Sequence, residues 1–226
     1  MLNQNTLQFL RDLSKNNNRD WFHENNERYQ IAKKEFEQFI NIVIMEISQF
    51  DPSIKNVKPK DCIFRINRDI RFSNDKSPYK TNMGGYIVPG GRNAGNAGYY
   101  IHIEPENCFL AGGIYMPPTD RLKAVRTEIY ENTDQFKEII YNKEFVKQFG
   151  DLSVEDKLIK PPKGFPKDFA DIDLLKYKHY SVLKALIEKT VTSKGYLKET
   201  IETFRVMFPF IQFINEAINY QLNKDN

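Results

Sequence analysis

The chain has 226 residues, a net charge of +3 and a pI near 8.6. This length fits one large domain or two small ones, and a hydrophobic content of 40% excludes an intrinsically disordered chain. The charge is too small for an architectural DNA-binding protein, and no apolar run approaches the roughly 18 residues of a membrane-spanning helix.

Helical periodicity dominates residues 1–50. Thr6 is the expected N-cap of a short helix that ends at residues 16–18, because three consecutive asparagines favour turns. Asp20 is expected to cap a long helix that runs to about Gln49, since apolar side chains recur there at spacings of three, four and seven. The N-terminal part of the chain is therefore predicted to be helical.

From Cys62 to about Tyr115 the hydrophobic period changes to the two-residue alternation of strands. The alternation predicts a strand over residues 64–72, with Arg68 on its apolar face. A glycine-rich segment at residues 89–98 predicts a mobile loop, because it contains little that can pack. Further strands are expected at residues 85–88, 99–104 and 108–114, the last two paired antiparallel across a short hairpin turn.

After Pro117 and Pro118 the helical period returns. Three prolines within residues 160–166 predict an extended loop, because proline disrupts helices and strand ladders alike. The other elements expected here are helices around residues 122–129 and 136–140, a helix or strand near 173–187, and a C-terminal pair of helices from Ser193 with a break at Pro209.

These elements together predict one α+β domain spanning residues 1–226. We expect an antiparallel β-sheet of about four or more strands, flanked by N-terminal and C-terminal helices. The domain is expected to be helical over residues 1–50, strand-rich over 61–116 and mainly helical over 117–226.

The two cysteines, Cys62 and Cys108, lie far apart and lack the spacing of a metal site. They are expected to be reduced, apolar residues of a cytoplasmic protein. The N-terminus has no basic segment followed by an apolar core, so we expect no signal peptide. The expected setting is therefore the cytoplasm, without membrane contact.

Positive charge is concentrated in residues 60–80, where six basic residues face three acidic ones. This surplus of +3 equals the net charge of the whole chain, which indicates a specific anion site on an otherwise balanced surface. Arginine forks and a lysine suit phosphate or carboxylate. The expected ligand-binding residues are Arg65, Arg68, Arg71 and Lys76, with Tyr79 supplying a hydroxyl, Asp69 orienting the arginines and Arg92 on a loop that would act as a lid.

Arg68 has two interpretations. Its predicted place on an apolar strand face requires a partner, because an unpaired buried charge is costly. Either a carboxylate from elsewhere in the chain pairs with it, or it lines a pocket and binds the anion of a ligand. Arg65 and Arg71, on the other strand face, could equally be solvated surface charges.

His102 and Glu104 share a strand face with Tyr100. A histidine and a glutamate two residues apart could act as a base and its partner or as two metal ligands, or they could simply be hydrogen-bonded on a half-exposed sheet. No third ligand stands at a recognisable spacing, so no metal site is predicted. No nucleotide-binding motif is present, and the sequence leaves the cofactor undetermined. The candidate catalytic residues are His102 and Asp69.

The chain resembles an uncharacterised bacterial family, domain of unknown function 2461. The family signature is R-x-x-R-D-x-R-F followed by [DN]-K-x-x-Y. The residues that fill it are Arg65, Arg68, Asp69, Arg71 and Phe72, then Asp75, Lys76 and Tyr79. The resemblance extends to residues 17–22, to Gly113, Tyr115 and Pro117, and to residues 162–165. It implies no established activity, substrate or cofactor.

The leading hypothesis is a cytoplasmic protein that binds a small anionic ligand. If it is an enzyme, the expected chemistry is at a phosphoryl or carboxylate-bearing substrate. One alternative is a nucleic-acid-binding module in which Tyr99, Tyr100 and Tyr115 stack on bases. Another is a structural ion network in a protein-interaction domain, for which replacing Arg68 would unfold the chain. The oligomeric state is undetermined.

Overall fold

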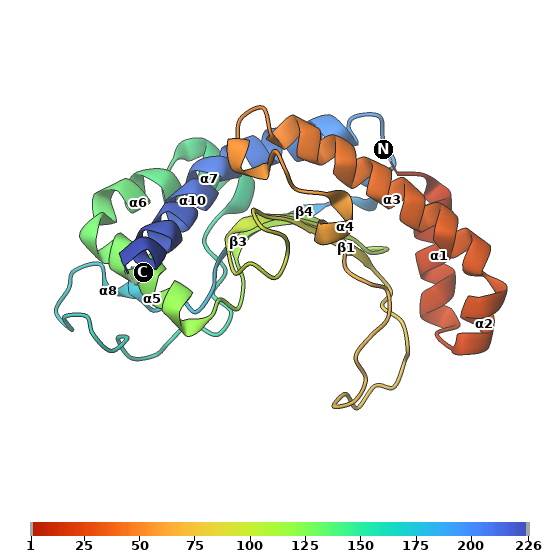
Figure 1. Ribbon diagram of the computed structural model, residues 1–226, viewed down its shortest axis with the longest axis horizontal. Coiled ribbons are helices and arrows are strands. Elements are labelled where there is room, and N and C mark those ends of the chain that lie inside the picture. Colours follow the sequence, from red (N-terminus) through yellow and green to blue (C-terminus); the bar gives the residue numbers. More distant parts are fainter. Residues whose placement is uncertain (1, 225–226) are drawn as a thin grey trace.

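A four-stranded antiparallel sheet forms the centre of the computed structural model, which describes residues 2–224 (Figure 1). Its strand order is β1-β2-β3-β4, so neighbours in sequence are neighbours in space. The strands are β1 (Met83–Ile87), β2 (Gly98–Ile103), β3 (Cys108–Ile114) and β4 (Tyr180–Leu186). With helices before and after it, this sheet confirms the predicted α+β class.

Helices precede and follow the first three strands. The N-terminal elements are α1 (Gln4–Lys15), α2 (Arg19–Glu24), α3 (Asn26–Ile47), the 3-10 turn η1 (Pro52–Ile54) and α4 (Pro59–Cys62). The others are α5 (Thr119–Glu131), α6 (Thr133–Ile140), α7 (Lys143–Phe149), α8 (Ile172–Leu175), α9 (Glu188–Val191) and α10 (Tyr196–Lys224). None of the helices within residues 2–224 combines the length and apolar character needed to cross a bilayer.

Three expectations about the helices are wrong in detail. Asn3 caps the first helix in place of Thr6, because its side chain accepts a hydrogen bond from Asn5 N. The expected long helix is divided into α2 and α3 at Asn25, and Asn18 caps α2. The expected C-terminal pair is the single helix α10, which continues through Pro209.

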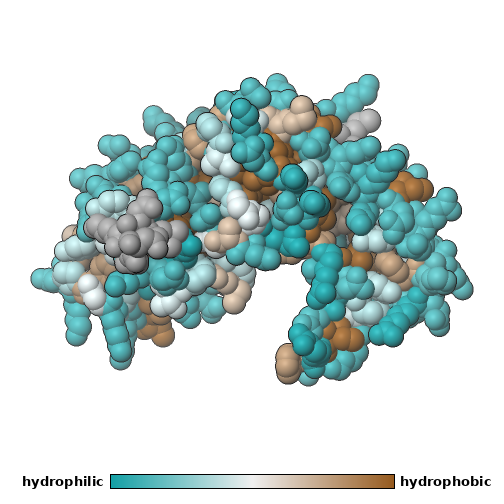
Figure 2. Space-filling view, viewed as in Figure 1, coloured by the Kyte–Doolittle hydropathy of each residue, from teal (hydrophilic) through white to brown (hydrophobic). Residues whose placement is uncertain are grey.

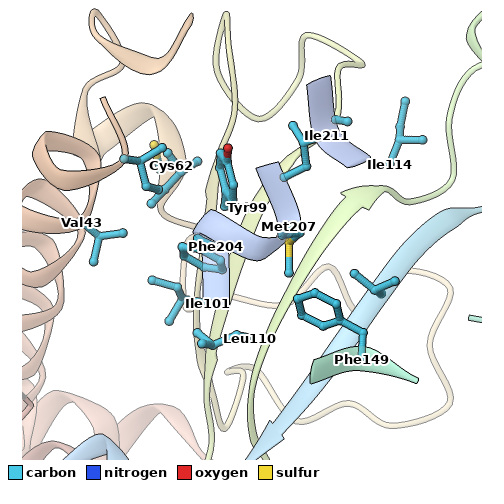
Figure 3. Close-up of a cluster of buried hydrophobic side chains, with 14 of the residues drawn as sticks. Val43, Cys62, Tyr99, Ile101, Leu110, Ile114, Phe149, Phe204, Met207 and Ile211 are labelled. Carbon is cyan, nitrogen blue, oxygen red and sulfur yellow. The ribbon is translucent and has the colours of Figure 1, made fainter. Parts of the chain in front are cut away.

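The two faces of the sheet differ in what covers them. Helices α3 and α10 lie on one face, where Tyr99, Ile101 and Leu110 pack against Phe204 and Met207 of α10 (Figure 3). The opposite face carries side chains of the other parity, among them Tyr100, His102 and Phe109, which contact one another. Figure 1 shows the molecule as an arch, with α3 and α10 on its outer side and this second face toward the hollow.

The segment between α4 and β1 forms an arm that projects away from the helices (Figure 1). We call residues 63–82 the arm. The regular strand predicted at residues 64–72 is absent from it, because only isolated bridges join Ile63 to Gly85 and Asn67 to Tyr79. A narrow ribbon beyond the sheet edge has little surface to bury on either face. The apolar alternation is therefore only partly used: Ile66 is buried, but Phe72 is 95% exposed.

Candidate functional site

The tip of the arm holds its own charges. Arg68 forms an ion pair with Asp75, and Arg71 donates two side-chain hydrogen bonds to Asp69, of 3.0 Å from Nε and 2.7 Å from Nη2. Lys76 Nζ donates to the Ile70 carbonyl at 3.0 Å. Hydrogen bonds from Arg71 lower the pKa of Asp69, so this exposed carboxylate stays ionised and paired. Arg68 and Arg71 are thus paired with carboxylates of the arm itself, as the ion-pair interpretation expects.

The carboxylate of Asp75 organises the turn at the tip. Its Oδ1 accepts hydrogen bonds from the backbone nitrogen and the hydroxyl of Ser77, at 2.9 and 2.6 Å. These bonds, together with that from Arg68, lower the pKa of Asp75 far below its usual range. The carboxylate that Arg68 requires therefore comes from the same arm, seven residues further along the chain.

The base of the arm is clamped to the helices at Tyr79. The Asn17 side chain binds the Tyr79 backbone through two hydrogen bonds, donating from Nδ2 to the carbonyl at 2.9 Å and accepting from the amide at 3.1 Å. The Tyr79 ring stacks on Phe22 of α2, with centroids 3.9 Å apart. Tyr79 is thus a packing residue that joins the arm to α1 and α2.

Two cations lie over the ring of Phe64 at the base of the arm, and a third, Arg65, lies close enough to Lys80 to influence its pKa. Lys80 Nζ lies 5.4 Å and Arg92 Cζ 5.9 Å from the ring centroid, both within cation–π range. Burial lowers the pKa of Lys80, and the charges of Arg65 and Arg92 lower it further. Within residues 2–224, no carboxylate forms an ion pair with Arg65, Lys80 or Arg92.

Strand β2 places a hydrogen-bonded relay beside these cations. Tyr100, His102 and Glu104 alternate along the strand and therefore point to the same face. The Tyr100 hydroxyl lies 3.0 Å from His102 Nδ1, and His102 Nε2 lies 3.2 Å from Glu104 Oε2. Glu104 also accepts hydrogen bonds from Thr81 of the arm at 2.7 Å and from Asn107 at 3.0 Å.

The pKa shifts of His102, Glu104 and Tyr100 indicate which group donates and which accepts in each hydrogen bond of the relay. Burial lowers the pKa of His102, so the ring is neutral near pH 7. Burial opposes ionisation of Glu104, but hydrogen bonds from Thr81, Asn107 and His102 outweigh it and lower the pKa. An ionised carboxylate only accepts, so Nε2 carries the ring proton and Nδ1 accepts from the Tyr100 hydroxyl. Burial and the Glu104 charge raise the pKa of Tyr100 to about 12, so it keeps its proton.

The cations and the relay meet at Phe64. The Phe64 and Tyr100 rings are 6.2 Å apart in an edge-to-face arrangement. Gly84 of β1 makes this possible, because a Cβ there would lie 2.6 Å from the Tyr100 hydroxyl oxygen. We call this constellation the arm-base site; its members are Phe64, Arg65, Lys80, Arg92, Tyr100, His102 and Glu104.

Comparison with known proteins identifies the family to which the chain belongs. The family model described as “Conserved hypothetical protein (DUF2461)” matches residues 5–213, which include the arm and the whole sheet. The chain belongs to this family. No significant match is found among the curated proteins, and none among the solved structures. The family is described as hypothetical, so the functional argument rests on the chemistry of the arm-base site.

The structure brings together only part of the predicted site. Arg65, Arg92 and His102 lie in the arm-base site, whereas Arg68, Asp69, Arg71 and Lys76 are engaged at the tip. Sequence reasoning missed Lys80 and Phe64 as site members, because the hydrogen bond from Lys80 N to Ile66 O that folds the arm back is a long-range feature. For Tyr100, the sequence indicated only that its side chain lies on the same strand face as His102, not that the two side chains are hydrogen-bonded.

Two further expectations change with the structure. The loop at residues 89–98 is held at both ends: Arg92 Nη1 donates to the Asp61 carbonyl at 3.0 Å, and Asn215 of α10 exchanges two hydrogen bonds with the Ala97 backbone. Tyr99 cannot stack on a base, because its ring is fully buried and its hydroxyl donates to Asp51 at 3.0 Å.

Proposed function

We propose that this protein binds a small molecule bearing phosphate or carboxylate at the arm-base site. The observation that carries the proposal is a group of three cations with which no carboxylate in the described part of the chain forms an ion pair; burial and the charges of Arg65 and Arg92 lower the pKa of Lys80. Like charges held together in partial burial favour an anion, because its charge relieves their repulsion. The arginines offer planar forks for two oxygens, and Lys80 adds a point charge.

The relay supports acid–base chemistry on that ligand. Tyr100 retains its proton near neutral pH, and His102 behind it can accept that proton or return one while Glu104 stabilises the imidazolium. With its proton directed toward His102, the Tyr100 oxygen beside a bound anion is a candidate general base, which takes a proton from a ligand hydroxyl or a water as its own proton passes to His102 Nδ1. Asp69 is a weaker candidate, because it is paired with Arg71 at the exposed tip.

The setting we propose for this activity is the cytoplasm. Cys62 and Cys108 are both free and buried. Burial raises the pKa of the Cys62 thiol to about 12, as expected for an inert structural cysteine. Reduced thiols of this kind fit a reducing compartment.

Thermal unfolding against a ligand panel at constant ionic strength tests the binding proposal. The panel contains inorganic phosphate, nucleotides, sugar phosphates, dicarboxylates and a short oligonucleotide. We expect one small anion to raise the Tm of the wild type, and Lys80→Ala to abolish the rise; a ligand at 100 times its Kd stabilises by about 2.7 kcal/mol. Lys198→Ala, which removes a lysine that is 80% exposed on α10, is the matched control.

Two outcomes would contradict the proposal of anion binding. If no small anion in the panel raises the Tm, the cations of the arm-base site have a structural role and bind no anionic ligand. A rise caused only by the oligonucleotide, fading steeply with salt, would favour nucleic-acid binding, because released counterions make that affinity salt-dependent. For the relay, Tyr100→Phe should leave anion binding in place while removing any turnover of the bound ligand.

A further inference from the structure

The arm presents one aromatic ring to the solvent at its tip. Phe72 is 95% exposed, and the contact described for its ring is the Arg71 guanidinium, 5.9 Å from the centroid. The end of the arm accordingly carries a hydrophobic colour in Figure 2. The bonds of Arg68, Lys76 and Asp75 hold the turn behind this ring in one shape. A braced projection that ends in an exposed aromatic ring is suited to insertion into a partner.

The charge of the tip restricts the partner. Residues 68–76 contain three cations, Arg68, Arg71 and Lys76, against the two anions Asp69 and Asp75, a net of +1. Because both arginines are already paired with these carboxylates, they are poorly placed to neutralise the phosphates of a nucleic acid. With both arginines paired, the uncompensated charge is that of Lys76, so the tip is complemented by an apolar pocket for the Phe72 ring with an acidic rim for one cation.

Such a groove lies between α6, α7 and α10. It encloses about 610 Å³, enough for an aromatic side chain. Its apolar lining includes Ile139, Val206 and Pro209. Among the charged residues that line it, Glu138, Glu144 and Glu216 outnumber the single cation Arg205, so the rim carries a net charge of −2. Apolar lining and acidic rim both match the tip of the arm.

We propose that Phe72 of one copy of this chain inserts into the α6–α7–α10 groove of a second copy. In Figure 1 the arm projects below the sheet, whereas α6, α7 and the C-terminal part of α10 form the left part of the arch, so the arm does not contact the groove of its own chain. Each arm–groove contact joins two different surfaces, and only a reciprocal pair of such contacts forms an isologous interface. If each chain offers its arm to the other, two such contacts close a two-fold dimer. The inference is independent of the anion site.

Sedimentation across a range of protein concentrations tests the contact. We expect the wild type to self-associate and Phe72→Ala to weaken that association at least about tenfold, the loss typical of a central aromatic anchor. Reversing the rim with Glu138→Lys and Glu216→Lys should weaken it comparably by repelling the tip. Both changes affect exposed side chains, so the variants should fold as the wild type does.

Matched controls separate the contact from general effects. Ile159→Ala removes an apolar side chain that is 94% exposed in a distant loop, and Glu37→Lys with Glu46→Lys reverses two exposed charges on α3. Neither should change association. Mixing Phe72→Ala with the rim variant should restore heterodimers, because each mixed pair keeps one intact arm and one intact groove.

Three outcomes would overturn the proposal. They are a wild type that stays monomeric at every concentration, association that Phe72→Ala leaves unchanged, and mixed variants that fail to pair. Binding of a 20-nucleotide single strand that is lost in Phe72→Ala, with a monomeric wild type, would assign the arm to nucleic acid.

Discussion

Replacing Asn17 by alanine should release the arm from the helices without unfolding the domain. The Asn17 side chain makes two hydrogen bonds to the Tyr79 backbone, and both are partly buried. At about 0.5–1.5 kcal/mol each, their loss lowers the free energy of local opening by about 1–3 kcal/mol. Because 1.4 kcal/mol corresponds to a factor of ten, amide exchange in the arm should accelerate by about five- to 140-fold.

Hydrogen exchange measured by mass spectrometry resolves this effect. The informative amides are those of Arg68 and Lys80, which donate to Pro78 O and Ile66 O across the arm. The control is Asn41→Ala, since Asn41 on α3 makes only a weak contact of 3.9 Å with the Met45 sulfur. Unchanged exchange in the arm would refute the clamp. Equal acceleration in β2 and β3 would also refute it, because the loss would then be global.

Other predictions address the sheet and the relay. Gly112→Ala should destabilise the fold by about 1–3 kcal/mol in urea unfolding, because its Cβ would lie 2.0 Å from the Met207 sulfur; Gly195→Ala, where the nearest atom is 3.7 Å away, should cost little. Tyr99→Phe should cost about 1–3 kcal/mol in the same assay, since it removes the donor from the buried Asp51 carboxylate. The folded-state pKa of His102 lies below the ordinary 6.5, so its contribution to stability is complete above that pH and is lost as pH falls. Between pH 7 and 5 the stability of His102→Gln should therefore fall less steeply than that of the wild type, and equal slopes would contradict the assignment.

The sheet was largely predictable because local and tertiary preferences agree. Residues 99–104 and 108–114 alternate in polarity around a short turn, and they form β2 and β3. The break expected at Pro209 fails for a tertiary reason. Phe204, Met207 and Phe210 bury their side chains on both sides of it, and this packing outweighs the missing backbone hydrogen bond.

The candidate site was less predictable than the fold. Strand parity correctly put Tyr100, His102 and Glu104 on one face, since that depends only on neighbouring residues. The division of the cations into a paired tip and an unpaired base depends on where the arm turns back. That turn is set by the carboxylate of Asp75 and by the hydrogen bonds from Asn17, 62 residues from Tyr79. Neither interaction produces a periodic pattern in the sequence.

Titration of the Lys80 ammonium group by NMR, with and without inorganic phosphate, tests the central claim most directly. Without an anion, the pKa of Lys80 should lie below the ordinary 10.5, because burial and the neighbouring Arg65 and Arg92 disfavour its charge. Saturating phosphate should raise that pKa while leaving Lys198 unchanged. A Lys80 pKa at its ordinary value, or one that phosphate does not move, would contradict the assignment of an anion site at the base of the arm.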